Sequence, residues 1–146
     1  MFQDGTLDVN HAHPDAFAAQ RNPRFTTLVV DAAGPSDGFL ENFIRAQGHV
    51  IVHAATAAEA LARTRECLPD LILLDNQLEG VAGLALIPEL LMERADAAVI
   101  VMARRPSAGE AVESIKLGAA DYLERPFDPF RLKQAIDLQK ALFKLP

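Results

Sequence analysis

Apolar residues between positions 25 and 143 fall into short runs that alternate with longer amphipathic segments. Apolar runs of about four to eight residues between turn-forming residues are typical of buried strands, and apolar residues three or four positions apart are typical of helices. The runs predict strands at residues 25–30, 49–53, 71–74, 97–102 and 122–124. The amphipathic segments predict helices at residues 38–47, 56–67, 83–92, 107–118 and 128–143.

Signals for helix starts support three of these helices. Thr56 and Ser107 each stand three residues before a glutamate, Glu59 and Glu110. This spacing is the pattern of a capping box, in which the hydroxyl and the carboxylate satisfy backbone N–H groups at the start of the helix. An Asp-Pro pair at 128–129 predicts the start of the last helix.

The alternation of strands and helices predicts an α/β fold with a parallel sheet covered on both faces. The expected architecture is a flavodoxin-like, doubly wound, five-stranded parallel sheet with strand order 2-1-3-4-5. In such sheets the functional crevice lies at the C-terminal ends of the strands, where strands 1 and 3 diverge. Asp31 and Asp75 follow those two strands, so both acids are expected at one mouth.

Composition separates the chain into two parts and excludes some function classes. Residues 1–24 are poor in large apolar side chains and predict a flexible N-terminal tail, whereas residues 25–146 predict one domain. The net charge of −6 argues against direct binding of nucleic acid, and no apolar run is long enough to span a membrane. The single cysteine, Cys67, excludes an intramolecular disulfide and favours a cytoplasmic protein.

Four stretches carry a family resemblance: "LVVDAA", "PDLILLDNQLEGVAGLALI", "VIVMARR" and "KLGAADYLERPFDPFRL". By the order and spacing of these stretches, residues 25 to about 143 resemble the receiver domain of two-component response regulators. The resemblance implies a non-enzymatic signalling module. Its partners would be a histidine kinase, a phosphotransfer protein or an output protein, and a homodimer is possible.

The resemblance also implies roles for individual positions. Asp75 would accept the phosphoryl group. An acidic pair at 31–32, Asp75 and the backbone carbonyl of Gln77 would hold Mg²⁺, which prefers oxygen ligands. A hydroxyl at the position of Ala103 and a lysine at that of Arg125 would contact the phosphoryl oxygens and neutralise charge as it develops.

This sequence keeps Asp75 and departs from the pattern elsewhere. Ala32 removes the second acid, Ala103 has no hydroxyl, Arg104 follows it, and Arg125 stands for the lysine. Because guanidinium groups bind carboxylates in two-point fashion, the sequence predicts a site neutralised by arginine. No cofactor is then expected, and Mg²⁺ would be needed only if Asp75 is a working phosphoacceptor.

The orientations of three side chains follow from these departures. Arg125 is expected to point inward and to pair with Asp75 or Asp31, beside a turn with a cis bond before Pro126. Such pairing predicts that Asp75→Asn destabilises the protein. Arg104 has two readings, one over the mouth and one in solvent. Tyr122 stands at the aromatic switch position of many receivers, and is expected to be a half-buried strand residue.

The sequence therefore favours an atypical receiver that acts mainly through protein–protein contact. One alternative is a working phosphoacceptor, phosphorylated on Asp75 by a histidine kinase and belonging to the regulatory part of a transcription factor. A flavodoxin-like ligand binder is the weakest alternative, because the loop after the first strand lacks a cradle rich in Ser, Thr and Gly for a phosphate group.

Overall fold

The computed structural model describes residues 25–32, 38–78 and 81–143. The predicted tail at 1–24 lies outside this part of the chain. No helix in the described part is long and apolar enough to cross a membrane.

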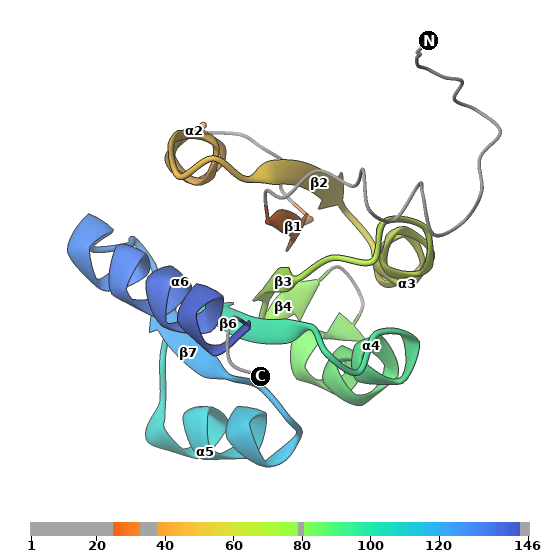
Figure 1. The fold of residues 1–146 in the computed structure, drawn as a ribbon. Coiled ribbons are helices and arrows are strands. Elements are labelled where there is room, and N and C mark those ends of the chain that lie inside the picture. Colours follow the sequence, from red (N-terminus) through yellow and green to blue (C-terminus); the bar gives the residue numbers. More distant parts are fainter. Residues whose placement is uncertain (1–24, 33–37, 79–80, 144–146) are drawn as a thin grey trace, which may run out of the picture.

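Five parallel strands form the central sheet (Figure 1). They are β1 (Thr26–Val30), β2 (Val50–Ala54), β3 (Leu71–Asp75), β6 (Ala98–Ala103) and β7 (Asp121–Glu124). Their order is β2-β1-β3-β6-β7, and each neighbouring pair is parallel. The predicted sheet and its order 2-1-3-4-5 are therefore confirmed.

Helices cover both faces of the sheet, as predicted (Figure 1). They are α2 (Phe39–Ala46), α3 (Ala57–Cys67), α4 (Ile87–Glu93), α5 (Ala108–Lys116) and α6 (Pro129–Phe143). Ile44 of α2 and Ile136 of α6 belong to one core cluster, and Ala60 of α3 and Leu90 of α4 belong to the other. Apolar burial on both faces provides most of the driving force for this layered arrangement.

The complete burial of the central strand β3 explains why its sequence is apolar without interruption up to Asp75. All of its residues are buried. Leu71 and Leu73 belong to the core cluster under α2 and α6, whereas Ile72 and Leu74 belong to the cluster under α3 and α4. A strand buried on both faces has no solvent-exposed face for polar side chains, so its residues are apolar. The strand ends at Asp75, the acid that lies in the site.

Two local features differ from the prediction. A small antiparallel hairpin, β4 (Gln77–Leu78) and β5 (Val81–Ala82), follows β3. The segment expected to be helical from residue 83 begins as the 3-10 helix η2 (Gly83–Leu86) before α4. Strands of two residues are too short to show an alternating pattern, so sequence periodicity does not detect them.

The helix starts are confirmed at the N-cap residues, but the two capping boxes differ. The backbone N–H of Glu59 donates to Thr56 Oγ1 at 3.1 Å. Glu59 Oε1 accepts the backbone N–H of Ala55, the residue before Thr56, at 2.8 Å. The N–H of Glu110 likewise donates to Ser107 Oγ at 3.1 Å. The carboxylate of Glu110, however, accepts from other elements, so the second predicted box is only half formed.

His49 is a buried titratable residue far from the strand ends that carry the acids. It is 4% exposed, its Nδ1 shares a 2.9 Å hydrogen bond with Thr27 Oγ1, and its ring lies 5.2 Å from that of Phe25. Burial, with a smaller contribution from Lys140, lowers its pKa from 6.5 to about 4, although Asp70 and Asp137 act in the opposite direction.

We predict an acid-dependent loss of stability through this histidine. The unfolded chain protonates near pH 6.5 and the folded chain only near 4, so His49 stabilises the fold fully above pH 6.5. This contribution falls as the pH drops from 6.5 to about 4, by on the order of 3 kcal/mol. Chemical denaturation between pH 7.5 and 4 measures it. His49→Phe should remove this part of the slope and His53→Phe should retain it; an unchanged slope in His49→Phe would contradict the assignment.

Candidate functional site

The C-terminal ends of β1, β3 and β6 surround one cavity of about 580 Å³. We call it the Asp75 pocket, and it is lined by Asp31, Ala32, Asp75, Asn76, Gln77, Arg104, Arg105 and Glu110. The sheet thus brings the two strand-end acids of the sequence to one mouth, because β1 and β3 are adjacent and parallel. Ala103 ends β6 as a buried residue without a hydroxyl.

Arg125 points into the site and pairs with Asp31. Its Nη2 donates to Asp31 Oδ2 at 2.9 Å, and the side chains are only 14% and 8% exposed. The same Nη2 lies 3.3 Å from Met102 Sδ, and the guanidinium lies 5.4 Å from the ring centre of Phe127. The peptide bond before Pro126 is cis, as predicted. The inward orientation is therefore confirmed, and Asp31 is the partner of the two that were left open.

Asp75 is placed differently. It is 6% exposed, and its Oδ1 accepts the backbone N–H of Gln77 at 3.0 Å. Among the described residues, no ion pair within 4.0 Å joins it to an arginine. Burial raises the pKa of Asp75 above its usual value and Asp31 adds to this effect, while the Gln77 N–H, Arg125 and Arg104 act against it.

Arg104 and Arg105 line the rim of the pocket with exposed side chains. Arg104 acts on Asp75 through its field, since it lowers the pKa of that acid without a hydrogen bond to it. Arg104 therefore lies at the mouth of the pocket with its side chain exposed to solvent.

Glu110 is the site residue that sequence reasoning missed. Its Oε1 accepts from Asn76 Nδ2 at 2.8 Å and from the hydroxyl of Tyr122 at 2.5 Å. The N–H of Ser107 donates to the Tyr122 hydroxyl at 3.3 Å, in the place where a complete capping box would put the glutamate. The capping spacing already accounted for Glu110, so no local signal indicated this second set of partners.

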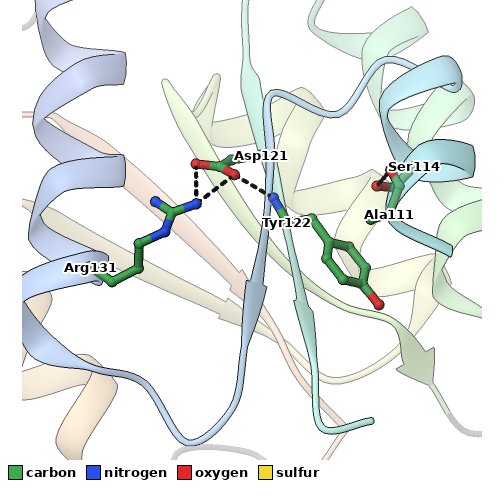
Figure 2. Close-up of polar contacts among 5 residues, drawn as sticks. All are labelled: Ala111, Ser114, Asp121, Tyr122 and Arg131. Atoms are coloured by element: carbon green, nitrogen blue, oxygen red, sulfur yellow. Dashed lines mark hydrogen bonds and ion pairs between the residues drawn. The ribbon is translucent and has the colours of Figure 1, made fainter. Parts of the chain in front are cut away.

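Tyr122 is a half-buried residue of β7, as expected. Its side chain lies on the side of the strand that faces α5 (Figure 2). The preceding residue, Asp121, lies toward α6, where it accepts from Arg131 Nη2 at 3.0 Å and from the N–H of Tyr122 at 2.8 Å (Figure 2). Burial and the hydrogen bond to Glu110 raise the pKa of Tyr122 above 10. Neighbouring residues of β7 are thus bound to different helices.

Gly83 holds the backbone beside Asp75. Its N–H donates to the carbonyl of Asn76 at 2.8 Å. A Cβ at this position would lie 2.1 Å from the carbonyl oxygen of Asp75. Glycine is therefore required by close approach of two backbone segments.

The side chains do not form the Mg²⁺ site that the resemblance implied. Position 32 has no carboxylate, and Oδ2 of Asp31 is engaged by Arg125. In the described ranges, no group of three or more His, Cys, Asp or Glu side chains is placed to hold a metal ion. Gln77 would offer a backbone carbonyl, as any residue would. The donor set as it lies does not fit Mg²⁺, which requires several oxygen ligands in octahedral geometry.

Comparison with known proteins agrees with the fold. The family model described as response regulator receiver domain matches residues 27–137. This chain belongs to the response regulator receiver family. It is therefore a receiver domain of two-component signalling.

Two curated proteins and one solved structure illustrate the similarity. The transcriptional regulatory protein ZraR of Salmonella typhimurium is 34% identical over 115 residues, which are 79% of this chain and 26% of that protein. The chain therefore spans about a quarter of the length of that relative. The chemotaxis protein CheY of Thermotoga maritima is 29% identical over 75% of this chain and 92% of its own length.

A solved response regulator from Burkholderia pseudomallei carries a phosphorylated aspartic acid, a calcium ion and citrate. It is 26% identical to this chain with a TM-score of 0.71, covering 83% of this chain and 75% of that one.

We predict opposite outcomes for two glycine-to-alanine substitutions. Gly83→Ala should destabilise the fold by about 2–4 kcal/mol, because the new methyl group collides with backbone that cannot move alone. Gly109→Ala is the control: nothing lies within 4 Å of its Cβ, and alanine favours the helix by up to about 1 kcal/mol. Urea denaturation compares them. Equal stability of the two variants would show that the loop after Asp75 adapts.

We also predict that the two acids respond in opposite directions. Asp31→Ala leaves the Arg125 guanidinium buried without its partner and should cost about 3 kcal/mol. Asp75→Asn removes a carboxylate whose ionised form burial disfavours, so it should raise the melting temperature. This reverses the expectation from sequence, which assumed that Asp75 was paired with arginine.

Thermal melts of both variants in chelator at pH 7 provide the measurement. The gain from Asp75→Asn should shrink as the pH falls through the raised pKa of Asp75 toward 3.8, because the wild-type acid then becomes neutral. A lower melting temperature for Asp75→Asn at pH 7 would restore the paired-acid hypothesis.

Proposed function

We propose that this receiver has an incomplete phosphorylation site and acts mainly through protein–protein interaction. The observation that carries the proposal is the buried Arg125–Asp31 ion pair at 2.9 Å. Arg125 engages the carboxylate that would begin a metal site, and Ala32 and Ala103 provide neither the second acid nor the hydroxyl. Phosphoryl transfer depends on such groups to neutralise developing charge.

The electrostatics support this proposal. A divalent cation at Asp31 would either break the contact with a guanidinium that is itself largely buried or lie close to its positive charge. Breaking such a pair leaves an uncompensated buried charge, and this cost opposes metal entry. The resident arginine thus supplies the positive charge that a metal ion would otherwise bring, and the resting protein needs no cofactor.

Two observations favour the second candidate, a working phosphoacceptor. Asp75 is retained and lines an open cavity, and the Burkholderia relative carries a phosphorylated aspartic acid. In this alternative a histidine kinase or phosphotransfer protein would supply the phosphoryl group. Mg²⁺ would be required at Asp31, Asp75 and Gln77, and Arg125 would serve in place of lysine.

Under either candidate we propose a cytoplasmic signalling module and not an enzyme. ZraR is a transcriptional regulatory protein, so this receiver is proposed to signal to a transcriptional output, carried by a longer protein or by a separate partner. The net charge of −6 supports contact with protein in place of direct contact with nucleic acid.

The deciding experiment is a Mg²⁺ titration followed by amide NMR, with and without beryllofluoride as a phosphoryl mimic. We expect no saturable shifts at Asp75 or at the Ala103–Arg104 loop. Ala32→Asp combined with Ala103→Thr and Arg125→Lys should bring back saturable binding, because it restores the acid, the hydroxyl and the lysine. Localised shifts in the wild type would favour the phosphoacceptor. Failure of the triple variant would place the obstruction elsewhere, with Arg104 as the next candidate.

A further inference from the structure

One carboxylate oxygen joins three elements around the Asp75 pocket. Glu110, in the first turn of α5, accepts with Oε1 from Asn76 at the end of β3 and from Tyr122 on β7. We call these three residues the Glu110 bridge. Hydrogen bonds to a charged acceptor are roughly twice as strong as neutral ones, so the bridge sets how the three elements lie together.

The pocket end of the bridge is rigidly attached to Asp75. Asn76 is the next residue, and its N–H donates to the carbonyl of Met102 at 2.9 Å. Its carbonyl accepts from Gly83 at 2.8 Å. Both backbone groups of Asn76 are therefore engaged, which fixes the residue that carries the amide side chain next to Asp75. Glu110 itself lines the pocket.

The other end of the bridge reaches an exposed surface. The Tyr122 hydroxyl accepts from Ser107 at the start of α5. Two large apolar residues of this helix, Val112 and Ile115, are 54% and 51% exposed. A change in the hydrogen bonding of Tyr122 therefore alters the N-terminus of a helix that presents apolar side chains to solvent. Ala103 offers no hydroxyl for a polar link by another route.

We propose that Glu110 is a positioning residue that couples the charge state of the Asp75 pocket to Tyr122 and to the start of α5. The coupling requires no phosphoryl group and no hydroxyl at position 103. It goes beyond the proposed function, because it operates whether the pocket responds to a partner protein or to phosphorylation. The hydrogen bonds of Glu110 connect the pocket to Tyr122, and a coupling between two sites requires such a shared set of interactions.

The composition makes the test direct. Tyr122 is the only tyrosine of the chain and there is no tryptophan, so absorbance and fluorescence in the tyrosine band, at wavelengths longer than those of the phenylalanine bands, report on this residue alone. Asp75→Asn provides a defined change of charge in the pocket. The Tyr122 signal is measured at pH 7 in the wild type, Asp75→Asn, Glu110→Ala and the double variant, which form a double-mutant cycle.

We expect Asp75→Asn to change the Tyr122 signal in the wild-type background and to leave it unchanged in the Glu110→Ala background. Glu110→Gln keeps an oxygen acceptor at the same place and should retain part of the response. Glu113→Ala, on the exposed face of the same helix, should retain all of it. These two variants distinguish loss of coupling from loss of folding, and circular dichroism checks each fold.

A Tyr122 response to Asp75→Asn of equal size with and without Glu110 would overturn the proposal. So would the absence of any response in the wild-type background. The result is independent of the Mg²⁺ and beryllofluoride titration, so failure of the bridge and failure of the incomplete-site proposal are distinguishable.

Discussion

The ion pair between Arg125 and Asp31 is the interaction on which the character of this site depends. It joins residues 94 positions apart, from the ends of β7 and β1, at 2.9 Å and in a largely buried setting. A guanidinium buried this deeply requires a carboxylate partner, and its positive charge beside that carboxylate opposes the approach of a second cation. The receiver fold is retained, but positive charge at its functional edge is provided by the chain itself.

This pair makes the two acids of the pocket unequal. Asp31 has a charged partner, whereas Asp75 relies on one backbone N–H and on the more distant field of the arginines. The burial that Asp75 shares with Asp31 therefore disfavours its ionised form. Two aspartates that look equivalent along the chain have different chemistry, because only one is within hydrogen-bonding reach of Arg125.

The Glu110 bridge shows how a polar connection can survive the loss of a hydroxyl. Ala103 ends β6 without a side-chain group that could form a hydrogen bond with Tyr122. Glu110 instead uses one oxygen to hold Asn76 and Tyr122, and Tyr122 in turn accepts the N–H of Ser107 that a capping glutamate would satisfy. The backbone donor at the helix start keeps a partner, so Glu110 is available to the pocket without leaving that N–H unpaired.

The sequence by itself determined the features that arise from local pattern. Apolar periodicity located the five strands and five helices, their alternation predicted the sheet order, and the positions of Asp31 and Asp75 at the ends of two strands placed both at one edge. Thr56, Ser107 and Asp128 marked helix starts, which the structure confirms. These features depend on neighbours a few positions apart, where residue type and period are sufficient.

Only the tertiary structure decided which groups within reach became partners. It selected Asp31 over Asp75 as the partner of Arg125, and it engaged the Glu110 carboxylate with Asn76 and Tyr122 instead of with its capping box. Each outcome depends on distances between elements far apart in the chain. A difference of one or two ångströms there separates an ion pair from a weak field effect, and residue patterns carry no such distances.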